Sequence, residues 1–334
     1  TYGVYGEANS AAGYGLYTPD RAHIGGALSV QGSTTLNGLS GNLAMLNSTG
    51  TTGNITKGGV SFIHDSGTEN TFIGASAGTL SLTGTGNTGA GMWTLSGVTR
   101  GNYNTAAGGA ALRYNTTAGQ NTAVGISALQ TQSFSNTDTA WNSDNTAVGF
   151  HALLSNQPTA STNGIQNTAI GSTALRNNST GAYNTAGGYS ALAGNTTGAF
   201  NTAIGVGADV TSGGLNNATA IGYGAKATAS DMVRIGNGAV TVIQGQVAFT
   251  ASSDRNKKEN LRDVNAQEIL AKLRGMSVTS WNYIGHDPKE FRHYGPMAQD
   301  FFAAFGRDEV GAIGTETTIN SGDIAGILMI GLKG

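Results

Sequence analysis

The sequence contains few of the residues that build an ordinary globular domain. Charged residues make up 11% of the 334-residue chain, less than half the usual share of about 25%. Proline occurs only four times, which excludes a proline-rich linker and a collagen. Cysteine is absent, which excludes disulfides and thiolate metal sites without fixing the compartment. Apolar residues reach only 38%. Such a chain builds a thin core that repeats along an axis more easily than one thick core.

Several classes of function are disfavoured by the same absences. A net charge of −2 gives no basic field for nucleic acid. No run of 18 apolar residues occurs, so we expect no membrane span in this segment. The chain begins at Thr1 without a signal-peptide pattern, so we expect a mature form, a fragment or a product exported by another route.

Motifs for metals and cofactors are also missing. The chain has no Cys/His site, phosphate loop or nucleophile elbow, so we predict no metal and no cofactor. His286 and His293 are seven residues apart with Asp287 nearby, which is not a strong metal spacing. We interpret both histidines as ordinary surface or core residues.

Glycine is abundant, with 53 residues or roughly twice the usual share of about 7%, and it belongs to an internal repeat. The repeat reads Asn-Thr-Ala, a small or β-branched residue and Gly, then two variable residues and Ala-Leu. Weaker copies begin at Asn70, Asn87 and Ala218. The six clearest copies begin at Asn104, Asn121, Asn145, Asn167, Asn184 and Asn201.

The copies are evenly spaced, which is typical of stacked architectures. Starts at 70, 87, 104 and 121 are 17 residues apart, as are those at 167, 184, 201 and 218. The two middle steps of 24 and 22 residues contain polar insertions around 134–141 and 157–164. We expect these insertions to form loops that leave a regular shaft.

Each part of the repeat has a physical interpretation. Thr-Ala-Ile/Val is short, alternating and β-prone, so it predicts one strand of a thin sheet. The following glycine permits a turn that a Cβ would block. Asparagine tolerates left-handed conformations and bonds its own backbone, so we expect it at the corner. One such unit cannot bury its apolar side alone, but stacked units can.

The repeat resembles the head of YadA-type trimeric autotransporter adhesins over residues 70–235. That resemblance implies a left-handed parallel β-roll that trimerises about its long axis. We therefore predict a mainly β fold, a parallel β-roll or solenoid fibre that forms a parallel homotrimer. A disordered glycine-rich tract is the alternative, but disorder does not require Ile, Val and Leu to return at fixed offsets.

Residues 1–69 share the glycine-rich style without the repeat, and we expect short strands of a fibre segment there. They loosely resemble phage tail fibres. The tyrosines of this segment could stack on carbohydrate or lie in a trimer core, and we favour the core. They are Tyr2, Tyr5, Tyr14 and Tyr17.

The composition changes near residue 250, where charges become dense. After a connector at 236–252 we predict a small α+β domain over 253–334. Asn265 and Glu268 have the spacing of a helix cap, and Gly275 can close that helix. A strand is expected at 276–283. Further helices are expected from Pro296 through Phe305 and from Ser321 onward.

Three motifs of this domain resemble the intramolecular chaperone domain of phage endosialidases and tail spikes, the S74 peptidase family. Ser253-Asp254-Arg255 precedes Lys258 and Asn260-Leu261. The helix EILAKL and the segment WNYIG follow. A last motif ends in Ala298-Gln299-Asp300, where Pro296 departs from the usual apolar residue.

The resemblance implies trimerisation, guided folding of the upstream fibre and autocleavage between Ser253 and Asp254. Ser253 would attack its own carbonyl carbon and Lys258 would be the base. Asp254, Arg255, Asn260, Gln299 and Asp300 would support the site. A lysine with a pKa of about 10.4 must be desolvated or lie near cations to act as a base, and Lys257 and Arg255 are near.

Two alternatives remain open for this site. Ser252 is a second candidate nucleophile. On spacing alone, Ser-Asp before basic residues is more often a solvated N-cap at a polar helix entry.

We therefore predict an extracellular fibre, on a cell surface or a virion tail, that attaches to an unknown cell-surface or glycan receptor. A polysaccharide-degrading spike is one alternative. It needs paired carboxylates facing a groove. Residues 70–220 offer only Asp138, Asp144 and Asp209. A C-terminal domain that trimerises without cutting is the other alternative.

Overall fold

The computed structural model describes residues 47–49, 52–246 and 252–334. The chain divides into two compact units, one ending at Ile243 and the other beginning at Gln244. The division falls inside the predicted connector at 236–252. The four tyrosines singled out near the N-terminus lie outside the described residues.

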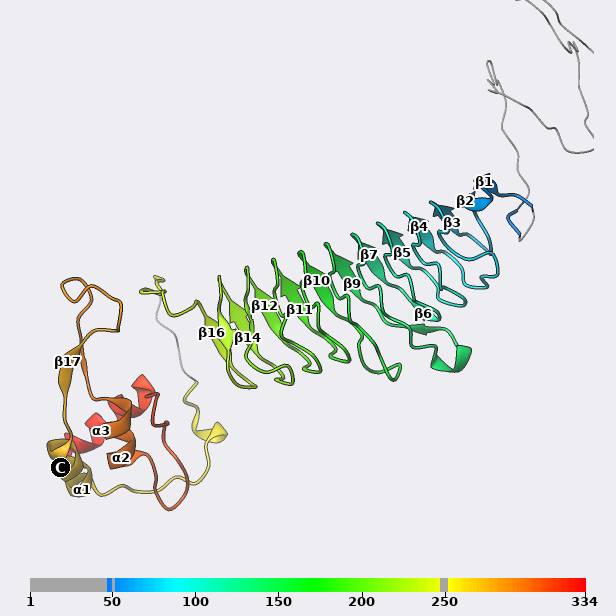
Figure 1. Cartoon of the computed structure of the whole chain (residues 1–334). Coiled ribbons are helices and arrows are strands. Elements are labelled where there is room, and N and C mark those ends of the chain that lie inside the picture. Colours follow the sequence, from blue (N-terminus) through cyan, green and yellow to red (C-terminus); the bar gives the residue numbers. More distant parts are fainter. Residues whose placement is uncertain (1–46, 50–51, 247–251) are drawn as a thin grey trace, which may run out of the picture. The chain divides into compact units, whose positions relative to one another are not determined.

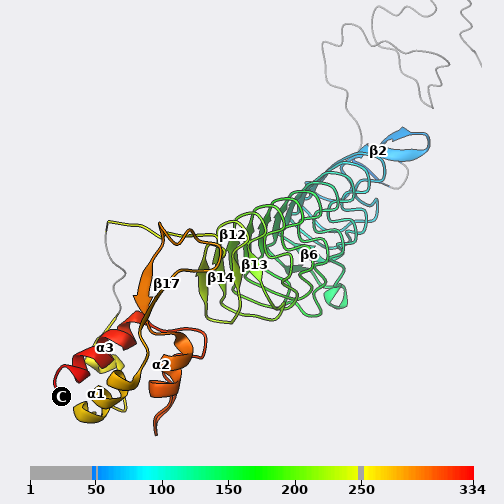
Figure 2. The same cartoon turned by 60° about the vertical axis from the view of Figure 1, so that its left-hand side comes forward.

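The first unit is a β-solenoid, a coil in which each turn adds one short strand to a long sheet (Figures 1 and 2). This sheet has 12 strands. β1 (Ile55–Lys57) and β2 (Val60–His64) form an antiparallel hairpin that also pairs antiparallel with β3. All later pairs of this sheet are parallel. The later strands are β3 (Thr71–Ile73), β4 (Thr88–Ala90), β5 (Thr105–Ala107), β7 (Thr122–Val124), β9 (Thr146–Val148), β10 (Thr168–Ile170), β11 (Thr185–Gly187), β12 (Thr202–Ile204), β14 (Thr219–Ile221) and β16 (Val233–Ile235).

The register of these strands confirms the repeat. We call the residues from one repeat start to the next a rung, and we number positions within a rung from the asparagine. The threonine at position 2 pairs with the threonine of the next rung from β3 to β14. Rungs with insertions keep this register, because the extra residues leave the coil after position 12.

The interior of the solenoid is thin, as the composition predicts. Alanine at position 3, alanine at position 8 and leucine at position 9 stack in three buried columns. These residues belong to one buried cluster that runs through many rungs, so no rung has a complete core alone. The leucine column comprises Leu95, Leu112, Leu129, Leu153, Leu175 and Leu192.

The repeat asparagines form a buried hydrogen-bonded ladder. The Asn184 backbone N–H and side-chain amide both donate to the Asn167 side-chain oxygen, each at 3.1 Å. The Asn184 amide also donates to the Gly198 carbonyl at 2.8 Å. Asn201 in turn donates its backbone N–H to Asn184 at 2.9 Å. Fully paired amides cost little to bury, which explains why a polar residue lies in this core.

The expected left-handed conformation of these asparagines is wrong. The left-handed residue is the one before each asparagine, such as Tyr103, Gln120 or Tyr183. The asparagine side chain is needed inside the coil for the ladder. The corner therefore falls one residue earlier, on side chains that point outward.

The glycine at position 5 behaves as predicted. From Gly74 to Gly205 it has φ between 125° and 137°, a region that disfavours side chains. A Cβ on Gly188 would lie 2.7 Å from the Gly205 carbonyl oxygen. Close stacking of backbones thus requires glycine here.

The first insertion folds back onto the coil. It contains the 3-10 helix η1 (Asn136–Asp138), and β8 (Trp141–Asn142) pairs in parallel with β6 (Ala118–Gly119). Arg100 and Asp138 form an ion pair at 2.8 Å. The loop is therefore anchored at both ends.

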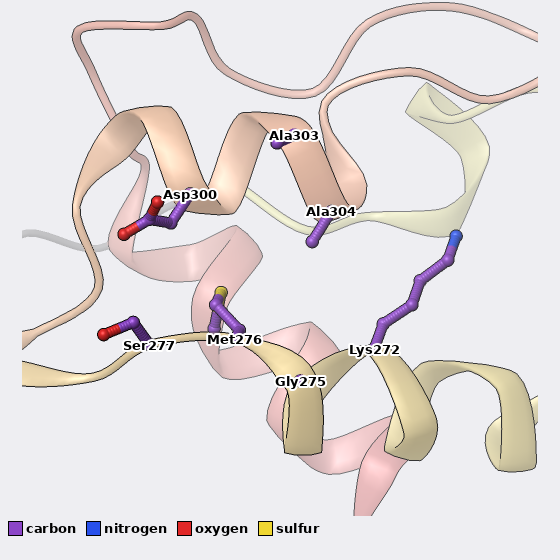
Figure 3. Close-up of a pocket in the computed structure, with 7 residues that line it drawn as sticks. All are labelled: Lys272, Gly275, Met276, Ser277, Asp300, Ala303 and Ala304. Atoms are coloured by element: carbon purple, nitrogen blue, oxygen red, sulfur yellow. The ribbon is translucent and has the colours of Figure 1, made fainter.

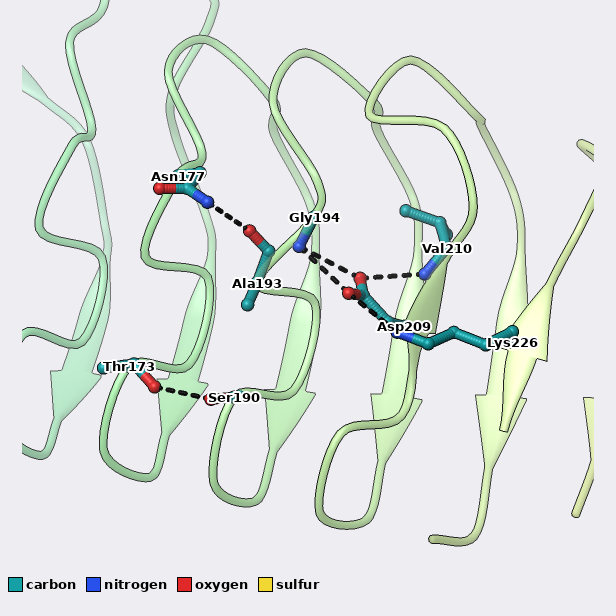
Figure 4. A network of polar contacts seen from close by, with 8 residues as sticks. All are labelled: Thr173, Asn177, Ser190, Ala193, Gly194, Asp209, Val210 and Lys226. Atoms are coloured by element: carbon teal, nitrogen blue, oxygen red, sulfur yellow. Dashed lines mark hydrogen bonds and ion pairs between the residues drawn. The ribbon is translucent and has the colours of Figure 1, made fainter. Parts of the chain in front are cut away.

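The leucine column ends in a charged pair (Figure 4). Asp209 replaces leucine in β13 (Asp209–Val210), and Lys226 replaces it in β15 (Lys226–Ala227). The Asp209 carboxylate accepts from the Gly194 N–H and lies 3.2 Å from the Lys226 Nζ. The last rungs thus change from apolar to polar contacts.

The second unit is small and mixed. Its elements are η2 (Arg255–Lys257), α1 (Ala266–Gly275), β17 (Thr279–Trp281), β18 (His293–Gly295), α2 (Ala298–Phe305) and α3 (Ser321–Gly331). β17 and β18 form an antiparallel pair. Phe301, Phe305 and Ile327 form its buried core, with Ile269 and Leu273 of α1 against them.

The three predicted helices are present, with differences at their ends. Asn265 caps α1 by accepting from the Gln267 and Glu268 N–H groups. The strand expected at 276–283 is shorter. Pro296 precedes the α2 cap, Met297, and so lies outside the helix. No helix among the described residues has the length and apolar character needed to cross a membrane.

Candidate functional site

The candidate nucleophile and base meet in the second unit. The Lys258 Nζ donates to the Ser253 Oγ at 2.7 Å. A hydroxyl within this distance of an amine can transfer its proton directly. Both side chains are exposed in the single chain. Ser252 is also exposed, and no hydrogen bond in the described part of the chain joins its side chain to a base.

A tight turn brings the two residues together. Asp254 caps η2, and its carboxylate accepts from the backbone N–H of Asn256 at 3.0 Å and from the Asn256 side-chain amide at 3.1 Å. The Lys258 N–H then bonds the Arg255 carbonyl at 3.2 Å. The chain reverses over these residues, so Lys258 returns to Ser253. This is the solvated cap that spacing alone favoured, and it also builds the dyad.

Sequence reasoning missed Asn256. Its spacing of two residues after a capping aspartate is the available signal, because an Asp cap bonds the N–H two residues on. Asn260 has a left-handed backbone, with φ of 55°, two residues after Lys258. That conformation redirects the chain after the turn.

The other predicted supporting residues are not joined to the dyad. Gln299 and Asp300 lie in the first turn of α2, and both are exposed. No hydrogen bond or ion pair between described residues connects them with Ser253 or Lys258. Arg255 lies in η2, between Ser253 and Lys258 in the chain.

Asp300 instead lines a hollow between α1 and α2, shown in Figure 3. Lys272 and Asp300 lie at opposite ends of this hollow, and Ala303 and Ala304 line its wall. Its volume is about 410 Å³. Small side chains and separated charges leave it without converging polar groups, so it has no catalytic arrangement.

The histidines lie in an aromatic cluster. The His293 ring stacks on Trp281 with centroids 4.6 Å apart, and Tyr283 lies edge-on to Trp281 at 5.0 Å. Within the ranges that the structure describes, no three His, Asp or Glu side chains gather as a metal site would require.

The outer face of the solenoid sheet is a second candidate surface. We call the outward residues at positions 17, 4 and 6 of the rungs the sheet face. Most exposed large apolar residues of the solenoid lie there. Tyr183 and Phe200 stack in parallel, with centroids 4.9 Å apart and an angle of 2° between the rings. Further members are Ile73, Met92, Tyr103, Val124, Ile126, Phe150, Ile170, Tyr189, Ile204, Val206, Ile221, Tyr223 and Ile235.

A comparison with protein families found one match, which lies in the second unit. Residues 253–309 match the family model of the chaperone of endosialidase, peptidase S74. The matched segment begins at Ser253 and includes the turn, α1, the β17–β18 pair and α2. No curated protein and no solved structure matches the chain. The match covers only a small part of the chain, and the solenoid lies outside it.

Proposed function

We propose that the chain is the shaft or head of an extracellular trimeric fibre, assembled by its own C-terminal chaperone domain, which then cuts itself free. The observation that carries this proposal is the 2.7 Å contact between Ser253 and Lys258 at the start of the segment that matches the S74 family. The fibre would belong to a virion tail or a cell surface and would serve attachment.

The sheet face supports a parallel homotrimer. Exposed apolar residues such as Ile170 (52%), Tyr189 (59%) and Phe200 (59%) recur along it at every rung or every second rung. Large contiguous apolar patches on soluble proteins mark interaction surfaces. Two further copies in the same register would cover this face, as in the YadA-type heads that the repeat resembles.

The cleavage step can be written with Ser253 and Lys258 alone. Neutral Lys258 takes the hydroxyl proton of Ser253, and the oxygen adds to the Ser253 carbonyl carbon. The carbon–nitrogen bond to Asp254 breaks, and the Asp254 nitrogen leaves as an amine with the proton carried by Lys258. The resulting ester is a four-membered lactone of Ser253, and water opens it so that Ser253 ends in a free carboxylate.

Neutral lysine at physiological pH requires removal from water or nearby positive charge. Lys258 is exposed in the single chain, and Arg255 and Lys257 flank it. Packing of three copies around the turn would bury it. This argument predicts that assembly precedes cutting.

Intact mass, measured on the purified full chain under denaturing and native conditions, tests both parts. We expect native trimers and a fragment ending at Ser253. Ser253→Ala and Lys258→Met should remain uncut, and Ser252→Ala should cut normally. Fragments ending at Ser252 would assign the bond before Ser253. Uncut wild-type trimers would instead support a trimerising domain that does not cut, and native monomers would contradict the fibre.

The polysaccharide-degrading alternative gains no support from the site geometry. Asp138 and Asp209 are paired with Arg100 and Lys226. Asp144 is the last residue of its rung, directly before Asn145, and so corresponds to the outward corner residue of the other rungs. A pair of free carboxylates facing a groove is therefore missing from the described rungs at 70–220.

A further inference from the structure

Two large exposed aromatic residues of the rungs lie away from the sheet face. They are Trp93 at position 7, exposed by 40%, and Tyr114 at position 11, exposed by 47%. In the other rungs, position 7 is occupied by smaller residues, including Ser76, Ser127 and Ser190. Because serine suits this position in other rungs, folding of the solenoid does not explain an exposed tryptophan here.

Trp93 is held in place by an arginine. The Arg113 guanidinium lies 4.6 Å from the Trp93 ring centre and 5.1 Å from that of Tyr114. No carboxylate in the described part of the chain forms an ion pair with Arg113. The guanidinium therefore lies close to two rings, and its donors make no ion pair with any carboxylate that the structure describes. Trp93 also has a left-handed backbone, with φ of 60°, which is unusual for a bulky residue.

Three rungs further along the coil, a ring and an arginine again occupy positions 7 and 10. His151 occupies position 7, and its ring stacks on Phe150 with centroids 3.7 Å apart. Arg176 occupies position 10 of the following rung, as Arg113 does. Arg176 also forms no ion pair within the residues described. Three strand spacings separate the two arginines along the axis, or about 14 Å.

We call these five residues the cationic edge: Trp93, Arg113, Tyr114, His151 and Arg176. Positions 7, 10 and 11 carry no Asp or Glu in any rung from 70 to 228. Two acidic residues elsewhere in the solenoid, Asp138 and Asp209, form ion pairs with Arg100 and Lys226. The edge thus presents two unpaired cations beside flat apolar rings.

We propose that the cationic edge binds an acidic polysaccharide, a polymer of sugar rings that carry carboxylates. Sugar rings would lie on Trp93 and on His151, and their carboxylates would accept hydrogen bonds from Arg113 and Arg176. Guanidinium pairs with carboxylates through two parallel hydrogen bonds. A spacing of about 14 Å suits a polymer several sugars long rather than a single sugar. The proposal rests on the attachment role proposed above and names its ligand class.

Binding of the full chain to immobilised polygalacturonate tests the inference, with the methyl-esterified polymer as the uncharged control. The variants use residues that neighbouring rungs already carry at the same positions, so the fold is preserved. Arg113→Gln copies Gln130, and Trp93→Ser copies Ser127. Arg176→Gln follows the same logic. Arg234→Gln is the control, because Arg234 is an exposed arginine of β16 that forms no ion pair among the described residues, and its removal takes away the same charge as each single arginine variant.

We expect the wild type to bind the charged polymer at least tenfold more tightly than its ester. Trp93→Ser and the double variant Arg113→Gln/Arg176→Gln should each lose about tenfold in affinity, while Arg234→Gln should bind as the wild type. The inference would be overturned if the double variant Arg113→Gln/Arg176→Gln bound the charged polymer as tightly as the wild type, or if the wild type did not bind it. Binding that needs the arginines but not Trp93 would overturn it as well, because charge alone would then suffice.

Native mass and cleavage are measured on the same samples. A variant that stays trimeric and cut but shows no change in binding counts against the cationic edge alone. Loss of the trimer in the wild type would count against the proposed fibre instead.

Discussion

The side chains of Ser253 and Lys258 meet at 2.7 Å because the Asp254 carboxylate caps the turn between them. Without the cap, the first turn of η2 loses the two hydrogen bonds from Asn256, and Lys258 is no longer directed back to the serine.

The cap gives the first prediction. Asp254→Ala should slow the proposed self-cleavage by up to about tenfold, because loss of an N-cap costs about 1 kcal/mol. Asp254→Asn should restore most of the rate, since asparagine caps as well. The rate is measured as the fraction of cut chain over time by denaturing electrophoresis. Asp263→Ala removes an exposed carboxylate outside the turn and serves as the control. Equal rates for all three variants would show that the cap has no role.

The asparagine ladder gives the second prediction. Asn184→Ala removes one amide and leaves the Asn201 N–H without its acceptor. Unsatisfied buried groups cost about 1–3 kcal/mol each, so we expect about 2–4 kcal/mol of destabilisation. The midpoint of urea unfolding measures this destabilisation. Asn177→Ala is the control, because Asn177 is exposed and its amide makes one hydrogen bond, to the Ala193 carbonyl (Figure 4). A similar loss in both variants would contradict the role of burial.

The third prediction concerns glycine at position 5. Gly188→Ala should destabilise the solenoid by about 2 kcal/mol or more, because its φ of 131° is strained for alanine and the Cβ meets the Gly205 carbonyl. Gly109→Ala, one position further in its rung, meets no atom within 4 Å and should be nearly neutral. The midpoint of thermal unfolding, measured for both variants, tests this prediction. A tolerated Gly188→Ala would mean that neighbouring rungs can move apart.

The fourth prediction concerns pH. Burial lowers the pKa of His151 below its ordinary value of 6.5, and the nearby Arg176 lowers this pKa further. The unfolded chain therefore takes up a proton first on acidification. The stability that neutral His151 contributes is present above about pH 6.5 and is lost as pH falls toward the lowered value. Titration by NMR should show this pKa rising in Arg176→Gln. An unchanged His151 pKa in this variant would contradict the electrostatic effect of Arg176 on His151.

The solenoid could be predicted in detail because the same sequence motif recurs in every rung. The strands, their register, the thin alanine–leucine core and the glycine at position 5 follow from spacing alone. The role of the asparagines did not follow. Asparagine suits both a buried amide ladder and a polar corner, so the sequence does not distinguish these two roles. The backbone conformation in the structure does distinguish them. Tyr103 and Phe200 at the corner gave no signal, because left-handed aromatic residues are unusual.

The second unit was predicted in its helices and only partly in its site. Caps such as Asn265 are local, so the sequence reveals them. The Ser253–Lys258 contact depends on a short turn that the spacing allows but does not require. The places of Gln299 and Asp300 depend on how α2 packs, which is a long-range property that no local pattern encodes.

Both ends of the parallel stack differ from its middle, and this difference limits how far the stack can grow. The β1–β2 hairpin turns the pairing antiparallel before the first rung. At the other end, Ala218 lacks the amide that would continue the ladder, and Asp209 with Lys226 replaces the leucine column. Another copy added end to end would lay apolar side chains on an ion pair. A further rung with the same repeat would therefore meet an antiparallel strand at one end of the described stack and a charged pair near the other.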